Sequence, residues 1–287
     1  MTATLGCVVL SDGRRPDDLR LAVESVLAQR GIERDLVVVG NGRTPAGLPP
    51  GVRTVELEQA VGIPAGRNAG VPHVRGDLLF FLDDDASLAH ADALERVARR
   101  FAEDPWLGVV QLRVASRGGG PASREWVPRL RVGNRSRSSD VTAVWEGAVA
   151  MRRGLFEQVG GWPADFRFVH EGVDLAWRIM DAGYRVHYAG DIVALHPSLT
   201  GAPHPYSAYY RARNRVWLAR RYLPIPLGAV YVGLFALRTV PRLRAREEVR
   251  RALRGYRDGV REPCGERRAL RIRTLWRMTL AGRPPVI

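Results

Sequence analysis

The segment FFLDDDASL occupies residues 80–88 and places three consecutive aspartates, Asp83, Asp84 and Asp85, directly after a run of large apolar residues. Continuous hydrophobicity is typical of a strand that is covered on both faces of a parallel sheet. Adjacent carboxylates repel one another and are costly to desolvate, so they need a compensating positive charge. The segment therefore predicts a buried strand that ends either at a bound cation or at an exposed turn capping the next helix.

Strands and helices alternate around this segment. Helical patterns follow Pro16, begin near residue 64 and extend over 90–103, and the predicted strands cover residues 5–10, 35–40, 52–57, 77–82 and 107–114. This alternation with short connections predicts an α/β domain with a mostly parallel sheet and helices on both faces.

The second half of the chain begins with a loop rich in Gly, Ser and Arg, over residues 115–140. A strand over 142–153, a short helix and turn, a helix over 171–183 and two short strands over 184–196 are predicted next. We expect a catalytic domain over 1–204, with a nucleotide-binding half at about 1–115 and an acceptor half at about 140–204. A basic, helical C-terminal region over 205–287 follows it.

The composition limits the possible partners and compartments. The chain has 287 residues and a net charge of +14, and all 44 of its basic residues are arginines. This charge favours anionic partners such as nucleotides, phospholipids or nucleic acid. The two cysteines, Cys7 and Cys264, show no disulfide framework or zinc spacing, and the N-terminus has no secretory signal pattern, so a cytoplasmic location is expected.

The position of the aspartates suggests a ligand. In open parallel sheets, ligands bind beyond the carboxyl ends of the strands, which is where the triplet is expected. Mg²⁺ and Mn²⁺ prefer oxygen ligands and commonly take one or two carboxylates together with phosphate oxygens. A short aspartate cluster after a strand therefore suits a site for a divalent metal and a diphosphate.

Four motifs occur in order: GCVVLSDGRRPDDLRLAVESVLAQ, FFLDDDASL, EGAVAMRRGLFEQVGGW and HEGVDLAWRIMDAGYRVHYAGDIVALH. Together they resemble family 2 glycosyltransferases, whose catalytic domain has the GT-A fold. The similarity is greatest to bacterial rhamnosyltransferases and galactofuranosyltransferases, and it covers roughly residues 4–225.

The resemblance implies a donor site for a UDP- or dTDP-linked sugar. Asp83 and Asp85 resemble the DXD-type pair of metal ligands, His196 joins the metal or diphosphate site, and Asp83 or Asp84 lies nearer the ribose. Gly40 replaces a usual acidic residue, so Asn41 becomes the candidate contact to the base. Further donor candidates are Ser11, Asp12, Arg67 and Asn68, with Arg211, Arg213 and Asn214 closing over the diphosphate or facing lipid.

The resemblance also implies a catalytic base and an acceptor pocket. An inverting transfer needs a carboxylate that takes the acceptor proton. The family's usual aspartate position corresponds to Gly172, so Glu171 is the favoured base and Asp174 the alternative, and either of them could instead cap the helix. The acceptor candidates are Trp145, Glu146, Gly147 and Trp162, the last of which could stack on a sugar or belong to the core.

The C-terminal region combines an apolar stretch with many arginines. Residues 222–237 are uncharged and include two prolines, but they are shorter than the roughly 20 residues of a spanning helix. Arginines and aromatic residues beside an apolar segment favour an anionic membrane surface. We expect peripheral attachment at the inner face of the plasma membrane, near a lipid-linked acceptor. The alternative is a helical subdomain that packs its apolar face on the sheet.

These observations predict a metal-dependent, inverting glycosyltransferase that acts on a glycan, lipid-linked or small-molecule acceptor in cell wall or polysaccharide biosynthesis. A sugar-phosphate nucleotidyltransferase is one alternative, although the loop after the first strand only faintly resembles its glycine-rich loop. A basic nucleic-acid-binding protein is the other, but it would leave the aspartate triplet unexplained. We therefore expect no nucleic-acid partner.

Overall fold

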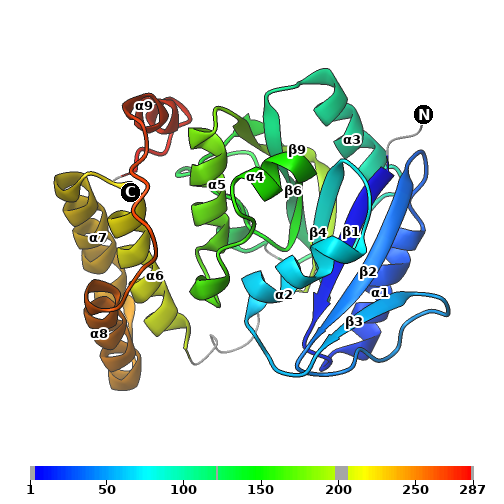
Figure 1. Ribbon diagram of the computed structural model, residues 1–287, viewed down its shortest axis with the longest axis horizontal. Coiled ribbons are helices and arrows are strands. Elements are labelled where there is room, and N and C mark those ends of the chain that lie inside the picture. Colours follow the sequence, from blue (N-terminus) through cyan, green and yellow to red (C-terminus); the bar gives the residue numbers. More distant parts are fainter. Residues whose placement is uncertain (1–3, 121, 198–205, 286–287) are drawn as a thin grey trace.

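The computed structural model describes residues 4–120, 122–197 and 206–285, and its centre is a nine-stranded sheet (Figure 1). The strands are β1 Thr4–Ser11, β2 Glu33–Asn41, β3 Arg53–Leu57, β4 Leu78–Asp83, β5 Ser87–Leu88, β6 Leu107–Ser116, β7 Ser139–Asp140, β8 Ala148–Arg152 and β9 Arg185–His196. The helices are α1 Pro16–Leu27, α2 Ile63–Gly70, α3 Ala93–Glu103, α4 Arg153–Gln158, α5 Glu171–Asp181, α6 Ser207–Tyr222, α7 Ile225–Thr239, α8 Arg246–Arg261 and α9 Ile272–Leu280.

The strand order is β3-β2-β1-β4-β8-β6-β9-β5, with β7 paired to β9. Strands β3, β2, β1 and β4 are parallel to one another, as are β6 and β9, while β8 runs antiparallel between β4 and β6. The expected α/β architecture with a mostly parallel sheet is therefore confirmed, with β8 and the short edge strands as its antiparallel members.

The sheet has a hydrophobic core on each face. Strand β4 alternates between them: Phe80 and Leu82 pack with α1 and α3, whereas Leu79 and Phe81 face α4 and α5. Because both faces are covered, nearly every residue of β4 is apolar, which explains the run before the aspartates. The apolar residues end where the strand passes beyond its covering helices, and there the polar side chains gather.

Two predicted boundaries differ from the structure. The strand expected over 142–153 is the shorter β8, which begins only at Ala148. Residues 184–196 were expected to form two short strands, but β9 is a single strand of 12 residues. Its pairing with β6 shifts register between Leu112 and Arg113, opposite Ala189 and Val193. This bulge contains Gly190 and Asp191, whose polar character interrupts the apolar pattern although the strand continues.

The predicted helical character of the C-terminal region is confirmed by α6–α9. Helix α6 shares a core with α5, because Tyr222 packs edge-on against Trp177 at 6.0 Å between ring centroids. Helix α7 lies outside α6 (Figure 1), and only Gly228 and Tyr231 of its residues are buried. Within the described ranges, no helix has the length and apolar character needed to cross a membrane. The domain division after residue 204 stays a prediction.

Candidate active site

The carboxyl ends of three neighbouring strands bring polar residues together. In the sheet register Leu10 faces Asp83, and Ser11 faces Gly40, so β1, β2 and β4 end at the same edge. Beyond β4 the chain turns back, with the amide of Ala86 donating to the carbonyl of Asp83 at 3.0 Å. The two-residue strand β5 then pairs with the end of β9, which brings the aspartates beside His196.

Asp83, Asp85 and His196 form a group that could hold a metal ion. Each offers one ligand atom, and these atoms all lie within 4.8 Å of one another. The Nδ1 atom of His196 lies 2.7 Å from the carbonyl oxygen of Pro197, which can only accept, so Nδ1 carries the hydrogen. In the neutral imidazole that a metal ion requires, Nε2 would be the ligand atom, and in this structure it lies 3.1 Å from Oδ1 of Asp85. Two carboxylates and an imidazole suit Mn²⁺ or Mg²⁺.

The charges of this group are coupled. Burial raises the pKa of Asp85, but the hydrogen bond and charge of His196, together with the charge of Arg15 and a backbone hydrogen bond, outweigh burial, so the pKa is lowered. Burial lowers the pKa of His196, yet its bond to Asp85 reverses the direction and the pKa is raised. The imidazole is held in place between Trp126 and Trp145, whose rings meet it edge-on at 5.2 and 5.4 Å.

Arg15 neutralises the other side of the triplet. From the residue before α1, its guanidinium pairs with Asp85 and lies 2.7 Å from Asp84. Asp84 also accepts from the hydroxyl of Ser11 at 2.8 Å. Burial raises the pKa of Asp84 to about 6, against the opposing effects of Arg15 and Ser11. In this structure the arginine, which the sequence analysis did not select, provides the positive charge that the triplet requires.

A second cluster lies on the other side of Asp83. The buried guanidinium of Arg67 donates to Asp83 at 2.6 Å and lies 3.8 Å from Glu171, which is also buried. Glu146, half-buried on the loop before β8, accepts from the backbone amide of Gly172 at 2.5 Å. Burial and the charge of Glu171 raise the pKa of Glu146 to about 8, and burial likewise raises the pKa of Glu171. Arg67 thus links the metal group to a pair of carboxylates.

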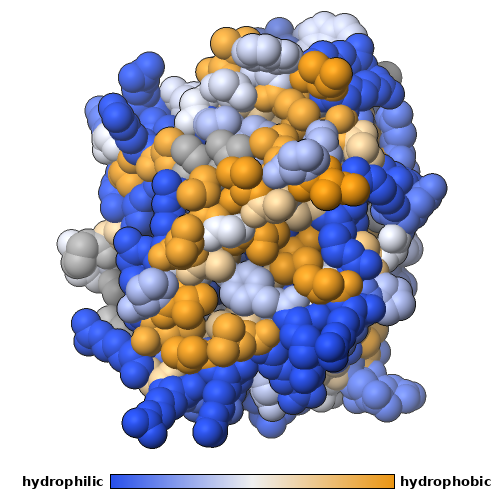
Figure 2. Space-filling model, turned by 90° about the vertical axis from the view of Figure 1, so that its left-hand side faces the viewer, coloured by the Kyte–Doolittle hydropathy of each residue, from blue (hydrophilic) through white to orange (hydrophobic). Residues whose placement is uncertain are grey.

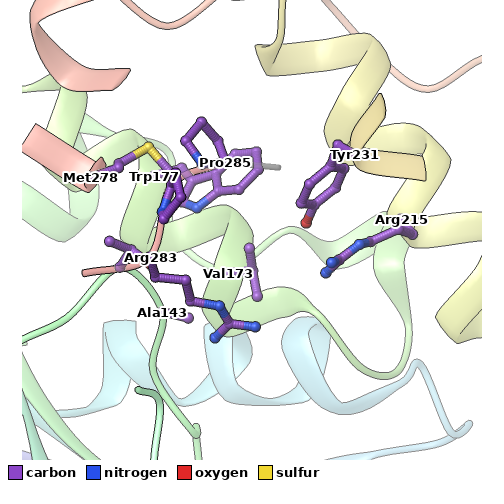
Figure 3. Close-up of a pocket in the computed structure, with 10 residues that line it drawn as sticks. Ala143, Val173, Trp177, Arg215, Tyr231, Met278, Arg283 and Pro285 are labelled. Carbon is purple, nitrogen blue, oxygen red and sulfur yellow. The ribbon is translucent and has the colours of Figure 1, made fainter. Parts of the chain in front are cut away.

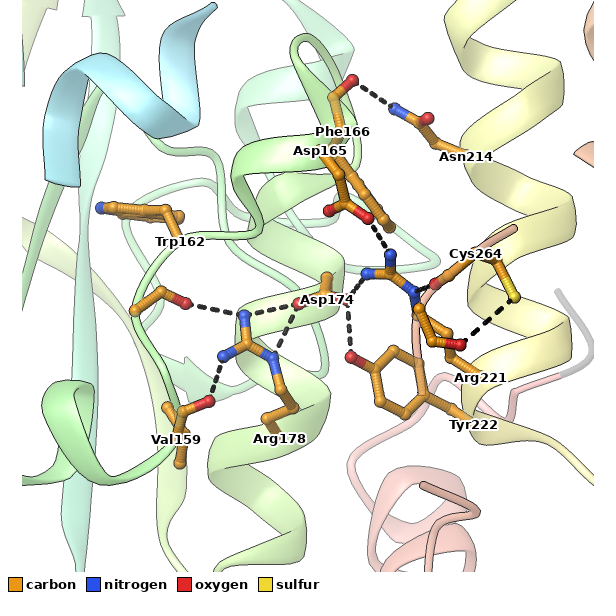
Figure 4. Close-up of polar contacts among 12 residues, drawn as sticks. Val159, Trp162, Asp165, Phe166, Asp174, Arg178, Asn214, Arg221, Tyr222 and Cys264 are labelled. Atoms are coloured by element: carbon orange, nitrogen blue, oxygen red, sulfur yellow. Dashed lines mark hydrogen bonds and ion pairs between the residues drawn. The ribbon is translucent and has the colours of Figure 1, made fainter. Parts of the chain in front are cut away.

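Asp174, predicted as the alternative base, is engaged elsewhere. Figure 4 shows its carboxylate between Arg178, Arg221 and Tyr222, and the tyrosine hydroxyl donates to it at 2.7 Å. Its side chain is fully buried, at 0% exposure. Arg178 continues the network to the carbonyls of Val159 and Gly161. These bonds give Asp174 a structural role, because they tie α5 to α6 and to the turn after α4.

Several predicted donor contacts also have structural partners. The amide group of Asn68 both donates to the carbonyl and accepts from the N–H of Trp162, at 2.8 and 3.0 Å. Arg213 does not lie over the aspartates but donates to the carbonyls of Asp165 and Phe166. In this structure both side chains brace the turns before α5, and their contact with the nucleotide stays a prediction.

Other donor candidates remain close to the strand ends. Asn41 accepts from the backbone N–H of Val61 at 2.9 Å, so it fastens the loop before α2. Asp12 accepts from the backbone N–H of Arg14 at 3.1 Å, in an exposed turn.

The two remaining candidates lie on α6. Arg211, which was expected to face the diphosphate or lipid, pairs with Glu125 at 3.0 Å, and Asn214 donates to the carbonyls of residues 166, 168 and 169.

The predicted acceptor residues divide into two groups. Trp145, Glu146 and Gly147 adjoin the metal group, and Asp83 donates its backbone N–H to the carbonyl of Gly147 at 3.0 Å. Trp162 is 1% exposed and packs against Phe81, Phe156 and Arg67, which is the core position that the sequence left open beside stacking on a sugar.

Arg117 is a further site residue that sequence reasoning missed. It follows β6, donates to the carbonyl of Asp85 at 2.8 Å and pairs with Asp18 at 2.6 Å. Its place directly after a strand was the available signal, but it belonged to a stretch predicted as loop. The bond holds the turn of the triplet against α1.

A small pocket lies apart from the aspartates, between α5, α7 and the C-terminal segment (Figure 3). Trp177 and Tyr231 form apolar walls, and the guanidinium groups of Arg215 and Arg283 face it. Arg215 is buried and stacks on the ring of Tyr231, with 3.8 Å from its Cζ to the centroid. None of the residues predicted for the donor or acceptor site lines this pocket.

Comparison with known proteins gives a family match. Residues 13–160 match the model of glycosyl transferase family 2. Pre-mycofactocin glycosyltransferases from two strains of Mycobacterium tuberculosis are 29% identical over 167 residues, which is 55% of this chain and 32% of theirs. The chain thus spans about a third of the length of these curated relatives.

Solved structures with a similar fold confirm the expected GT-A architecture. The mannosyltransferase PcManGT from Pyrobaculum calidifontis, in complex with GDP-Man and Mn²⁺, has a TM-score of 0.58 at 16% identity and covers 98% of this chain and 73% of its own. S. aureus TarS 1-349 in complex with UDP-GlcNAc has a TM-score of 0.60 at 14% identity, and the match covers 91% of this chain and 81% of that chain. GalNAc-T7 with UDP, GalNAc and Mn²⁺ has a TM-score of 0.64 at 15% identity, and the match covers 90% of this chain and 55% of that chain.

Proposed function

The chain belongs to glycosyl transferase family 2, and we propose that it transfers a sugar, with inversion, from a nucleoside-diphosphate donor to a hydroxyl group. The observation that carries this proposal is the meeting of Asp83, Asp85 and His196 at the carboxyl ends of the strands. The acceptor is a glycan, a lipid-linked intermediate or a small molecule. The narrower subtype, a rhamnosyltransferase or galactofuranosyltransferase, stays a prediction from the resemblance.

The donor half of the proposal rests on charge. Asp83, Asp85 and His196 would hold Mg²⁺ or Mn²⁺, and the ion would neutralise the diphosphate as it leaves. Arg15 would lie beside that diphosphate, because its guanidinium already pairs with Asp84 and Asp85. Ser11, at the end of β1, and Asp84, directly after β4, would face the nucleoside. Solved structures of similar fold contain GDP-Man or UDP-GlcNAc, and a UDP- or dTDP-linked sugar is proposed here.

The acceptor half requires a base. The acceptor oxygen forms a bond to the anomeric carbon, the bond from that carbon to the diphosphate breaks, and the hydroxyl proton passes to a carboxylate. Half-buried Glu146 and buried Glu171 lie beyond Asp83, and Arg67 joins Glu171 to Asp83. Because this pair and the metal group lie on two sides of Asp83, a sugar held between them could be attacked from the side opposite the nucleotide.

Calorimetric titration of UDP and dTDP tests the donor site. We expect binding in Mn²⁺ that disappears in EDTA and in Asp85→Ala. Asp92→Ala is the matched control, since it removes an exposed carboxylate before α3 and should bind like the wild type. Loss of binding in both variants, or binding that is indifferent to EDTA, would contradict a metal–diphosphate site at the triplet.

The alternative reactions have different signatures. A sugar-phosphate nucleotidyltransferase would form a nucleotide sugar and pyrophosphate from UTP or dTTP and a sugar 1-phosphate, which chromatography detects directly. A nucleic-acid-binding protein would retain duplex DNA in a salt-dependent manner and would ignore UDP. Neither alternative accounts for the carboxylate pair beside the triplet.

We also propose that the exposed side of α7 binds an anionic membrane surface. Figure 2 shows apolar residues gathered on the face that carries the C-terminal helices, with hydrophilic residues along its margins. Ile225 and Leu237 are 78% and 74% exposed, at the two ends of α7. Exposed arginines, Arg238, Arg242 and Arg244, follow directly. Apolar side chains bordered by arginines complement a bilayer with anionic headgroups.

Sedimentation with lipid vesicles tests this surface. We expect co-sedimentation with vesicles containing phosphatidylglycerol, weaker binding to pure phosphatidylcholine, and loss in the variant Ile225→Ser/Leu237→Ser. Leu21→Ser is the control, because Leu21 is 46% exposed on α1, at the other end of the molecule (Figure 1). Unchanged vesicle binding by the serine variant would contradict the proposal that this side of α7 binds a membrane. A wild-type dimer that the variant dissociates would contradict it as well and would make this face an interface between two copies of the chain.

A further inference from the structure

Gly172 leaves a space that another residue fills. A Cβ atom built on Gly172 would collide with the carbonyl oxygen of Val144 and with the carboxylate of Glu146. The backbone N–H of Gly172 donates to Oε1 of that carboxylate at 2.5 Å. The carbonyl oxygen of Val144 and the Glu146 carboxylate therefore together occupy the volume into which a side chain at position 172 would project, at the start of α5.

The position of Glu146 is set from the sheet. The next residue, Gly147, accepts the backbone N–H of Asp83 at 3.0 Å, and a Cβ on Gly147 would collide with Asp83 and with the ring of Trp145. Trp145 in turn meets the ring of His196 at 5.4 Å. Glu146 is thus fixed one residue from the backbone contact that holds the metal group.

The two glutamates differ in access. Glu171 is 3% exposed, and within the described residues its Oε2 atom is buried without a hydrogen-bond partner. Glu146 is only half-buried, and its raised pKa, caused by burial and by Glu171, makes it a stronger base than an ordinary carboxylate. An acceptor hydroxyl could reach Glu146, whereas Glu171 faces the guanidinium of Arg67 at 3.8 Å.

We propose that Glu146, entering from the loop before β8, is the base that takes the acceptor proton, and that it stands in the place of a side chain at position 172. Glu171 is then a positioning residue, whose carboxylate lies beside the Arg67 guanidinium and helps to balance its positive charge. The inference rests on the proposed sugar transfer and replaces the expectation that Glu171 is the base. In the step itself, the acceptor O–H bond breaks and its proton passes to Glu146 while the oxygen bonds to the anomeric carbon, and the bond from that carbon to the diphosphate breaks, so that the nucleoside diphosphate leaves with the electron pair.

Substitutions at positions 146 and 172 test whether the Glu146 carboxylate and a side chain at position 172 would compete for the same volume. Gly172→Asp alone should lower the melting temperature by several degrees, because its side chain meets Glu146. Glu146→Ser/Gly172→Asp should recover the part of that loss that the Glu146 carboxylate causes, because the serine vacates its share of the space, whereas the contact with the carbonyl oxygen of Val144 remains. An equal melting temperature for Gly172→Asp and wild type would overturn the geometric argument without reference to activity.

Turnover tests the chemical role. The probes are UDP-galactose, UDP-N-acetylglucosamine and dTDP-rhamnose with Mn²⁺, and the readout is nucleoside diphosphate released by transfer to water. Glu146→Gln should reduce the rate about 10²- to 10⁴-fold with unchanged affinity for UDP, and Glu171→Gln should reduce it less. Glu146→Ser/Gly172→Asp should be at least tenfold faster than Glu146→Ser.

The failures can be told apart. A Glu146→Gln variant with the wild-type rate, or a wild type that binds UDP but releases none from any probe, would overturn the assignment of the base and leave the donor site intact. A wild type that binds neither UDP nor dTDP would instead overturn the proposed function.

Discussion

The guanidinium of Arg15 lies 2.7 Å from the carboxylate of Asp84, although the two residues are 69 positions apart in the chain. The same guanidinium pairs with Asp85, one of the three residues of the candidate metal group. An arginine thus stands where a bound cation would be expected to act. A metal ion that binds Asp85 must compete with Arg15, and the displaced guanidinium would be free to meet a diphosphate.

Arg15→Ala should therefore have opposite effects on two ligands. Binding of Mn²⁺ alone should become several-fold tighter, because the ion no longer competes with a guanidinium for Asp85. Binding of UDP in saturating Mn²⁺ should become weaker, because a cation beside the diphosphate is lost. Electron paramagnetic resonance of free Mn²⁺ measures the first effect and calorimetry the second.

Arg14→Ala is the control for this pair of measurements. Arg14 is the exposed neighbour, 3.6 Å from Asp12, and its removal changes the net charge by the same amount. If both variants tighten Mn²⁺ equally, the effect comes from general electrostatics, and the proposed competition at Asp85 is wrong.

The sequence was informative where one physical rule governs many residues. The alternation of apolar runs predicted the strands, and the chemistry of carboxylates at a strand end predicted the group around Asp83 and Asp85. His196 came from the resemblance. Arg15 was missed because nothing local distinguishes it from Arg14, and only the folded chain brings it to the triplet. Trp162 stayed undecided because an aromatic residue after a turn has the same pattern in a core as in a binding site.

Position 172 shows a second limit. The sequence revealed the missing side chain at Gly172, and Glu146 was assigned to the acceptor pocket, but no spacing connects residues 26 positions apart. Their relation depends on how α5 packs against the loop before β8, which is a tertiary contact. Substitutions that compensate each other in space remain invisible in a single sequence.

Gly147→Ala should disrupt the metal group. The added Cβ would meet the ring of Trp145 and the carboxylate of Asp83, so one of them must move. We expect at least a tenfold loss of UDP affinity in Mn²⁺, measured by calorimetry. Gly154→Ala is the matched control, because nothing lies within 4 Å of its added Cβ. Equal affinities in the two variants would show that Asp83 does not need its present position.

Asp174→Asn should destabilise the fold more than it affects the chemistry. The substitution leaves Arg178 and Arg221 without their buried anion (Figure 4), and breaking a buried pair typically costs about 3–5 kcal/mol. Urea denaturation measures the free energy of unfolding. Glu157→Gln, which breaks an exposed pair with Arg153 at 3.6 Å, should change it by less than about 1 kcal/mol. A stable Asp174→Asn protein without turnover would restore Asp174 as a catalytic candidate.

The raised pKa of Glu146 predicts how stability depends on pH. Folding moves this pKa from 4.5 to about 8, so between these values the folded state binds more protons than the unfolded state. The contribution of Glu146 to the free energy of unfolding therefore falls as pH rises from about 4.5 to about 8 and is constant outside that window. Glu146→Gln cannot titrate, so its stability relative to wild type should increase between pH 5 and pH 8. Urea denaturation of both proteins at pH 5, 6, 7 and 8 measures this difference, and parallel profiles would contradict a shifted Glu146.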